Sequence, residues 1–386
     1  MHRFEFASAQ QIIFGAGTAA ELGSHAAGLG NRALLVVGSG SVPLEGLLQD
    51  LSDHRLDVQV FRVSHEPTLD VITRGVDFAR NTQRDLVIGF GGGSVMDSAK
   101  AIGVLLANPG SLLDYLEVVG PGRPLTQPGC PVICLPTTAG TGAEVTRNAV
   151  LAVPERRVKV SMRGRFLLPT LAIVDPLLTV SAPPAVTAAS GMDALVQNLE
   201  AYVSAAHNPL TDGISCAGLA QAAACLLPAF LNGGDVAARE GMAQASLFGG
   251  ISLANAGLGA VHGLAGVLGG FYEGAPHGAL CGRLLPAVMR ANLQALAREG
   301  EGSFYLERYR EIARILSGEQ QADPQDGVAW AEELLQELAL PKLREMGARR
   351  EEFPEIAAKA QEASSMKKNP VRLSTAVLVR ILEEAF

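Results

Sequence analysis

The chain has 386 residues, of which 48% are hydrophobic and 18% are charged, a composition typical of a globular protein and not of a disordered one. Its formal net charge of −8 disfavours nucleic acid or an anionic membrane as a partner. The length predicts two domains. We also expect a cytoplasmic protein without a membrane span, because the N-terminal segment has no basic region before an apolar core and no long apolar run is free of charges and turn residues.

In the first half of the chain, short apolar runs alternate with helical patterns. The runs predict strands at residues 33–37, 56–63, 85–90, 132–135 and 171–174, and the apolar spacing predicts a helix over residues 71–82. This alternation is typical of a parallel sheet that helices cover on both faces. Residues 1–180 are therefore predicted to form an α/β domain.

The strand signal ends near Pro183, and only helical patterns follow it. Two prolines in the segment LTVSAPPAV end one pattern and begin another, which indicates a domain boundary. Residues 181–386 are therefore predicted to form an all-α domain. Its expected helices span residues 187–203, 213–226, 237–253, 280–293, 303–315, 327–338, 350–363 and 375–386.

The segment GFGGGSVMDSAK leads from an expected strand through glycines into an expected helix. Gly91, Gly92 and Gly93 would let the backbone approach a ligand closely, and Ser94 can cap the helix or donate to a phosphate. The order of strand, glycines and helix is the one that pyrophosphate binding requires. The segment matches neither GxGxxG nor a Walker loop, so a plain structural turn remains the alternative.

The segment PTTAGTGAEVT follows another expected strand. Its hydroxyl side chains, Thr137, Thr138 and Thr141, would lie at the carboxyl end of that strand, where open α/β sheets bind ligands. Read alone, the segment could be a loop that caps the next element. Because both loops are expected at the same end of one sheet, together they favour a nucleotide site.

A possible metal site lies in the helical half. Asp193 and Gln197 are four residues apart and so share a helix face, while His262 and His277 each precede a glycine. Imidazoles and a carboxylate are usual ligands of Fe²⁺ or Zn²⁺. Read one by one, Asp193 could be a helix-cap residue and His262 a hydrogen-bonded core histidine. The cysteines match no zinc spacing and are expected to be buried thiols: Cys130, Cys134, Cys216, Cys225 and Cys281.

The segments GFGGGSVMDSAKAIG, LPTTAGTGAEVT, IVDP, SGMDAL, GLGAVHGLAGVLGG and PHGALCGRLLP occur in this order. With them the chain resembles the iron-containing (group III) alcohol dehydrogenases from about residue 5 to about residue 380. The resemblance implies a dehydroquinate synthase-like fold. Its Rossmann-like N-terminal domain would bind a nicotinamide dinucleotide, its helical domain would bind a divalent metal, and the alcohol or aldehyde would occupy the cleft between them.

For the metal, the resemblance implies an aspartate and three histidines. Asp193, His262 and His277 match, whereas the third histidine position falls on Gln197, whose amide oxygen is a weaker donor than imidazole. We therefore expect Asp193, Gln197, His262 and His277 to bind one Fe²⁺ or Zn²⁺ with reduced affinity. A further family histidine, linked to proton transfer, falls on Gly266, so the pocket is expected to be wider and to lack that relay.

For the cofactor, the resemblance places an acidic, NAD-selecting residue at Gly38. Without that acid, Gly38, Ser39 and Gly40 could bind a 2′-phosphate, so both NADP and NAD are allowed. Lys159 resembles a family lysine near the nicotinamide and joins His262 and His277 as an expected catalytic residue. The expected cofactor-binding residues are Gly38, Ser39, Gly91, Gly92, Gly93, Ser94, Asp97, Thr137, Thr138, Thr141, Lys159 and Leu178.

The function predicted on this basis is an NAD(P)-dependent, metal-assisted oxidoreductase that interconverts a small alcohol and its aldehyde or ketone. Its partners would be small molecules, without nucleic acid or membrane, and a homodimer is compatible with the sequence. The alternatives are a maleylacetate reductase-like enzyme, for which Arg147 is a candidate cationic residue, a dehydroquinate synthase-like lyase, and a metal-free NADP-binding protein.

Overall fold

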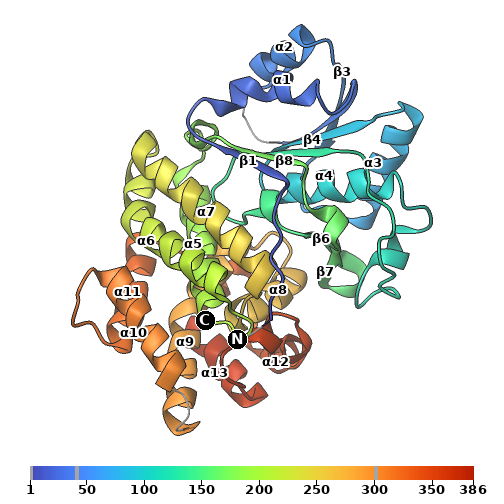
Figure 1. The fold of residues 1–386 in the computed structure, drawn as a ribbon. Coiled ribbons are helices and arrows are strands. Elements are labelled where there is room, and N and C mark those ends of the chain that lie inside the picture. The colour runs from blue at the N-terminus through green and yellow to red at the C-terminus, as the bar shows by residue number, and fades with distance from the viewer. Residues whose placement is uncertain (1–2, 40–42, 300–302) are drawn as a thin grey trace. The chain divides into compact units, whose positions relative to one another are not determined.

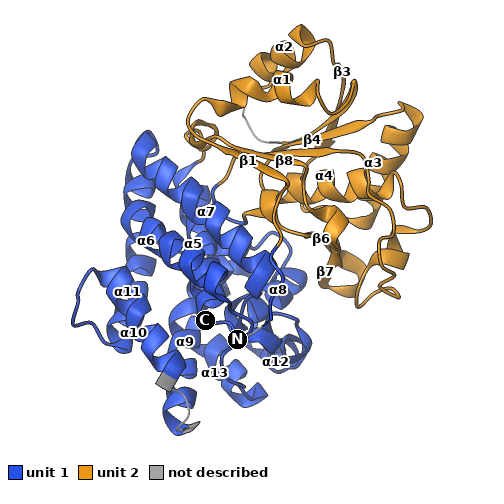
Figure 2. Ribbon diagram, viewed as in Figure 1, with its two compact units in different colours: residues 1–6, 139–141, 183–386 blue, residues 7–138, 142–182 orange. Residues whose placement is uncertain are grey.

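The computed structural model describes residues 3–39, 43–299 and 303–386. The chain forms two compact units, shown in different colours in Figure 2. Unit 1 comprises Met1–Phe6, Ala139–Thr141 and Pro183–Phe386, and unit 2 comprises Ala7–Thr138 and Gly142–Ala182. Each unit has its own secondary-structure class, as the sequence predicts.

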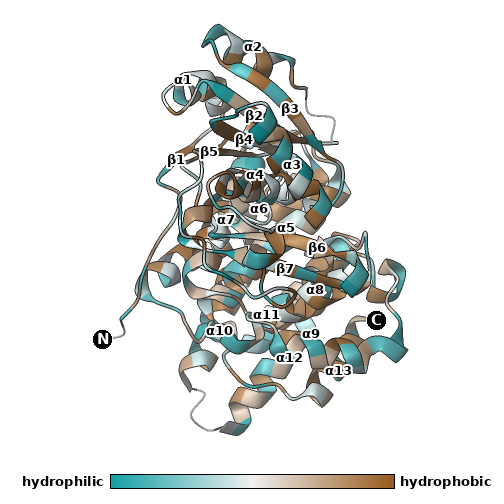
Figure 3. Ribbon diagram, turned by 90° about the vertical axis from the view of Figure 1, so that its right-hand side faces the viewer, coloured by the Kyte–Doolittle hydropathy of each residue, from teal (hydrophilic) through white to brown (hydrophobic). Residues whose placement is uncertain are grey.

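Unit 2 is built on a parallel sheet of six strands, in the order β1-β8-β5-β4-β2-β3 among the described residues (Figure 1). All of its pairings are parallel, which confirms the predicted α/β class. The interior strands β4 and β5 are buried along their whole length and carry the hydrophobic colour in Figure 3. The strands are β1 (Gln11–Phe14), β2 (Arg32–Gly38), β3 (Asp57–Val63), β4 (Leu86–Gly91), β5 (Val132–Pro136) and β8 (Leu171–Val174).

Helices cover both faces of this sheet because alternate strand residues point to opposite sides. On one face Leu34 shares a core with Ile72 and Ile102. On the other face Leu35 shares a core with Leu22 and Leu51. The helices are α1 (Leu22–Ala26) and α2 (Glu45–Asp53) on the second face, and α3 (Leu69–Asn81) and α4 (Gly93–Leu105) on the first.

An antiparallel hairpin, formed by β6 (Asn148–Val153) and β7 (Val158–Arg163), completes unit 2. The sequence analysis did not predict it, nor the short strand β1. Apolar Val158, Val160 and Met162 alternate with polar residues along β7, so the hairpin's signal was the period of two that marks a strand with one packed face.

The strand order creates a switch point between β2 and β4. These strands are neighbours, but the chain continues from β2 to β3 on one side and from β4 to β5 on the other. Open α/β sheets bind ligands at such a point, outside the carboxyl ends of the strands. Gly38, Gly91 and Pro136 end the three adjacent strands β2, β4 and β5 at that edge.

Unit 1 is all-helical, as predicted, over its described residues. Its central helix α5 packs against α6, α7 and α9. The helices are α5 (Pro184–Tyr202), α6 (Pro209–Leu231), α7 (Val236–Ala256), α8 (Ala260–Phe271), α9 (His277–Glu299), α10 (Ser303–Ser317), α11 (Pro324–Glu337), α12 (Phe353–Glu362) and α13 (Thr375–Ala385). Helix α8 was not among the expected helices, and α9 begins earlier than expected, at His277.

By length and composition alone, α6 is apolar enough to cross a membrane. Residues 213–231 carry no charge, although Pro228 interrupts the run. The bent pair of α7 and α8 passes the same test if it is counted as one span. The core helix of a soluble protein meets this criterion too, and α6 packs against α5, α7 and α10, so one or two such candidates are weak evidence for a span.

Candidate metal centre and cofactor loops

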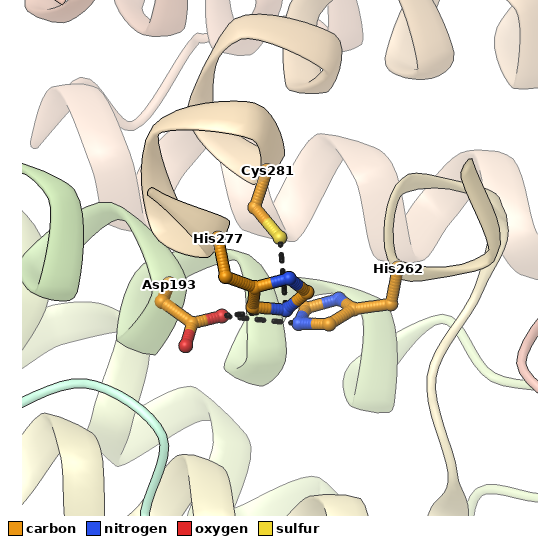
Figure 4. A group of neighbouring side chains, drawn as sticks. All are labelled: Asp193, His262, His277 and Cys281. Atoms are coloured by element: carbon orange, nitrogen blue, oxygen red, sulfur yellow. Dashed lines mark hydrogen bonds and ion pairs between the residues drawn. The ribbon is translucent and has the colours of Figure 1, made fainter. Parts of the chain in front are cut away.

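Three helices of unit 1 bring the predicted metal ligands together. Asp193 lies in the middle of α5, His262 in the first turn of α8 and His277 at the start of α9 (Figure 4). Cys281, one turn further along α9, directs its sulfur to the same place. One ligand atom from each of these four residues lies within 4.8 Å of those of the others.

The distances describe a compact cluster. His262 Nε2 lies 3.1 Å from Asp193 Oδ1, and His277 Nε2 lies 3.9 Å from the same oxygen. Cys281 Sγ lies 3.6 Å from His277 Nε2. The side chains of Asp193 and His262 are 3% and 8% exposed, whereas that of His277 is 33% exposed, so solvent reaches the cluster from the side of His277.

A close backbone contact positions His277. An added Cβ on Gly278 would lie 1.9 Å from the carbonyl oxygen of Ala189 and 3.0 Å from Cβ of Asp193. Only glycine permits the first turn of α9 to approach α5 this closely. The glycine after the histidine in PHGAL therefore places the imidazole beside Asp193.

Glu200 orients the other histidine. One of its oxygens accepts a 2.6 Å hydrogen bond from the backbone N–H of Val261, and the other lies 2.7 Å from His262 Nδ1. A carboxylate that accepts a hydrogen bond from Nδ1–H leaves Nε2 free as a metal ligand, an arrangement common around metal-bound histidines. The sequence analysis did not identify Glu200, although it lies seven residues after Asp193 and so two turns along the same face of α5.

Gln197 adjoins the cluster, and its side chain already has protein partners. Its Nε2 donates to the carbonyl oxygen of Gly140 at 3.2 Å, and its side chain also hydrogen-bonds to Asp193. Its Oε1 is buried and has no hydrogen-bond partner among the described residues. A buried amide oxygen without a partner is costly unless a ligand satisfies it.

The charges in the cluster are coupled. Burial raises the pKa of the Asp193 carboxyl, but the hydrogen bond from His262 and the positive charge of His277 outweigh burial, and the net pKa is lowered. Burial likewise raises the pKa of the Cys281 thiol, and the two imidazoles outweigh it, so that this pKa is also lowered. Burial lowers the pKa of His262, but the charge of Cys281 and the hydrogen bonds with Asp193 and Glu200 outweigh burial and raise it.

The residues present fit a divalent metal. They offer a carboxylate, two imidazoles, a thiol and an unpartnered amide oxygen, which are donor types that Fe²⁺ and Zn²⁺ accept. Cys281 is a buried thiol, as expected, but its place beside the candidate metal ligands was not predicted from the sequence. Its signal was the four-residue spacing from His277, which puts both side chains on one face of a helix.

In unit 2, the two predicted cofactor loops are adjacent. Gly91 pairs with Pro136 at the ends of β4 and β5, and Thr137 N donates to the carbonyl oxygen of Gly91 at 2.9 Å. An added Cβ on Gly92 would lie 3.3 Å from Oγ1 of Thr138. Gly92 is also the N-cap of α4 and provides no side-chain cap, so this helix start can accept an anion.

Five of the remaining expected cofactor residues lie at the carboxyl ends of strands of this sheet or shortly after them. Gly38 ends β2, and Ser39 donates weakly to the carbonyl oxygen of Ser64 at 3.4 Å, while Gly40 lies outside the described residues. Gly93 and Ser94 form the first residues of α4. Leu178 lies in the 3-10 helix Pro176–Thr179, which follows β8.

Asp97 and Lys159 already have protein partners. The carboxylate of Asp97 forms a 2.9 Å ion pair with Lys100 and accepts the backbone N–H of Val150 at 3.0 Å, which joins α4 to β6. Lys159, on β7, pairs with Glu66. Thr141 belongs to unit 1, unlike the other expected cofactor residues.

Two family profiles together match most of the chain. The family profile described as "Iron-containing alcohol dehydrogenase" matches residues 9–176, and that described as "Fe-containing alcohol dehydrogenase family, C-terminal" matches residues 187–386. "Alcohol dehydrogenase 4" of Saccharomyces cerevisiae is 34% identical over 360 residues, which cover 92% of this chain and 91% of that protein.

Solved structures agree with the sequence relatives. The crystal structure of 1,3-propanediol oxidoreductase superposes with a TM-score of 0.92 at 32% identity and full coverage of both chains. That of sulfoacetaldehyde reductase from Bifidobacterium kashiwanohense in complex with NAD⁺ superposes with a TM-score of 0.85 at 27% identity, covering 100% of this chain and 99% of that one. The chain therefore belongs to the iron-containing alcohol dehydrogenase family, which confirms the predicted NAD(P)-dependent alcohol and aldehyde oxidoreductase at the level of that family.

Proposed function

We propose that this chain is a metal-assisted reductase of small aldehydes or ketones that accepts NADPH at least as well as NADH. Residues 1–180 would bind the nicotinamide cofactor and residues 181–386 the metal. The observation that carries the proposal is the convergence of Asp193, His262 and His277, with Glu200 behind one of the rings. This arrangement argues against a metal-free NADP-binding protein.

Asp193, His262 and His277 would hold the metal, and two further side chains, Gln197 and Cys281, are near enough to complete the set. When bound, the metal supplies Lewis-acid polarisation of the carbonyl oxygen and the reduced nicotinamide supplies a hydride to the carbonyl carbon. Glu200 keeps the ring of His262 in the orientation that leaves Nε2 available.

The loops of unit 2 would bind and orient the cofactor. The uncapped start of α4, from Gly91 to Ser94, suits a pyrophosphate, and Thr137 and Thr138 offer hydroxyls beside it. We further propose Asp97, Lys159, Leu178 and Thr141 as cofactor-binding residues, with Lys159 nearest the reacting ring. Because Asp97 is engaged with Lys100, its part would be to hold the α4 loop in shape.

The substrate pocket would be open at Gly266. An added Cβ at this position meets nothing within 4 Å, so the residue leaves free space where the family places a histidine. Without that relay, the proton for the product oxygen would come from solvent. The open space leaves room for a substituent beside the reacting carbon of a small aldehyde or ketone.

The test is a steady-state assay with NADH and NADPH over a series of short aldehydes, paired with metal analysis of protein purified without chelator. We expect turnover with about one bound ion per chain, and we expect both to be lost in His277→Ala, while the variant of an exposed histidine, His54→Ala, keeps both. Well-folded protein that takes up neither Fe²⁺ nor Zn²⁺ would contradict the metal-assisted mechanism.

The same assay separates the remaining alternatives. Turnover of maleylacetate in preference to every aldehyde, with loss on Arg147→Ala, would identify the maleylacetate reductase-like enzyme. Substrate conversion without net change in the cofactor would identify the dehydroquinate synthase-like lyase. A cytoplasmic location, the absence of nucleic acid and membrane partners, and a homodimer stay predictions for fractionation and for size-exclusion chromatography with light scattering.

A further inference from the structure

We propose that Cys281 is a protein ligand of the metal, taking the fourth place that the resemblance gives to a histidine at Gln197, and that its sulfur shifts the preference of the site from Fe²⁺ towards Zn²⁺. This inference rests on the proposed metal-assisted function, because it concerns the same ion. It concerns which atoms hold that ion and which ion they select.

The spacing of the donor atoms carries the inference. A tetrahedral zinc ion with bonds of about 2.05 Å to nitrogen or oxygen and about 2.3 Å to sulfur places nitrogen and sulfur about 3.6 Å apart, and nitrogen and oxygen about 3.3 Å apart. The observed distance from Cys281 Sγ to His277 Nε2 is 3.6 Å, and the two distances from imidazole nitrogen to Asp193 Oδ1 are 3.1 Å and 3.9 Å. Three of the six distances between the donor atoms are therefore within about 0.6 Å of those of such a site, and all four donor atoms lie within 4.8 Å of one another.

The helix geometry fixes the sulfur in this place. Cys281 follows His277 by four residues on α9, and the contact of Gly278 with α5 holds the start of that helix against Asp193. The Cys281 residue is fully buried, so its sulfur faces the cluster and not the solvent. On coordination the S–H bond breaks, the proton passes to solvent, and the sulfur lone pair forms the bond to the metal.

Gln197 is the weaker rival for the same place. Its amide N–H groups are used by Gly140 and Asp193, and its free Oε1 is a neutral oxygen donor. Thiolate is a softer donor that favours zinc, whereas an all-imidazole and carboxylate set also suits iron. The chain therefore replaces a lost imidazole with sulfur on a different helix, and Gln197 serves to hold Asp193.

The experiment uses Co²⁺ as a spectroscopic probe of the full-length protein. Chelated wild type, Cys281→Ser and Cys225→Ser are titrated with Co²⁺, and the near-ultraviolet thiolate-to-cobalt charge-transfer band is recorded. Cys225 is a half-buried thiol elsewhere in unit 1 and serves as the matched control. Competition titrations with Zn²⁺ and Fe²⁺ follow, and circular dichroism verifies that each variant is folded.

We expect the band in wild type and Cys225→Ser, its loss in Cys281→Ser, and a Zn²⁺ affinity lower by about tenfold or more in that variant, since even loss of an outer partner of a ligand costs that much. Adding Gln197→His to Cys281→Ser should restore affinity without restoring the band. Co²⁺ binding without the band in wild type, or an unchanged band in Cys281→Ser, would overturn the inference while leaving the metal-assisted function intact. Failure of folded wild type to bind any of these ions would overturn both.

Discussion

Glu200 holds the Nδ1 side of the His262 ring, opposite the side that faces Asp193. Glu200 accepts from the backbone N–H groups of Val261 and His262 and from the His262 ring. A glutamine offers only one acceptor oxygen for these donors, so Glu200→Gln should loosen the ring and lower metal affinity by about 10- to 100-fold. Competition titration against a chelator measures this, with the exposed Glu333→Gln as control. Equal affinity in wild type and Glu200→Gln would show that the carboxylate does not orient the ligand.

The choice of cofactor is expected to depend on Gly38. A carboxylate facing the 2′-phosphate would cost on the order of a few kcal/mol in a partly desolvated pocket. Gly38→Asp should therefore lower kcat/KM with NADPH far more than with NADH. Gly38→Asn introduces a side chain of the same shape without the charge, so it should leave the ratio of the two kcat/KM values near that of wild type. If both variants shift the ratio equally, the cause is size and not charge, and the assignment of this loop fails.

At this scale, donor chemistry and family spacing singled out three of the four clustered residues from the sequence. Asp193, His262 and His277 converge in the structure, and their binding of a metal stays a prediction. Cys281 and Glu200 were missed because a buried thiol and a buried carboxylate have no chemical signal until the facing helix is known. Their spacing from His277 and Asp193 shows only that they share a helix face with a ligand.

Among the elements, the contact between α9 and α5 is the tightest constraint on the site. Gly278→Ala would push Cβ into the Ala189 carbonyl oxygen, so we expect a loss of about 1–3 kcal/mol in the free energy of unfolding and weaker metal binding. Gly266→Ala on α8 is the matched control, because its Cβ meets nothing within 4 Å and alanine favours the helix by roughly 0.5–1 kcal/mol. Urea unfolding of both variants compares their free energies of unfolding. Equal values would mean that the start of α9 can move away from α5 without a loss of stability.

The type of an element was predictable where its sequence is a continuous apolar run or has one clear apolar period. The strands β2, β4 and β5 are continuous apolar runs, which the sequence analysis recognised. Helix α8 was not recognised, since four of its twelve residues are glycines and its propensity is low. Tertiary packing supplies its stability: Val261, Leu264 and Leu268 are buried in the core of unit 1.

For the whole molecule, one buried carboxyl makes stability depend on pH. Burial raises the pKa of Glu144 from 4.5 to about 7, with the charge of Lys100 acting in the opposite direction. The folded state therefore binds this proton more tightly than the unfolded chain. Its contribution to stability is full below about pH 4.5 and is lost as the pH rises through about 7.

Glu144→Gln removes this titration. The free energy of unfolding of the variant relative to that of wild type should therefore rise between about pH 5 and about pH 8. Urea unfolding of both proteins at several pH values in this range measures the difference. The exposed Glu337→Gln is the control for the loss of one negative charge. A difference between variant and wild type that stays constant with pH would show that Glu144 is ionised throughout.

Because Glu200 joins the start of α8 as well as the His262 ring, we expect these hydrogen bonds to hold the donor set in place whether or not an ion is bound. Small zinc domains fold only as the metal binds, so their metal exchange is as slow as their unfolding. In this protein exchange should instead be limited by ion dehydration and by rotation of the more exposed ring, His277. A chelator should accordingly strip the ion while the helices of unit 1 persist, and a different divalent ion can then take its place without refolding of the chain.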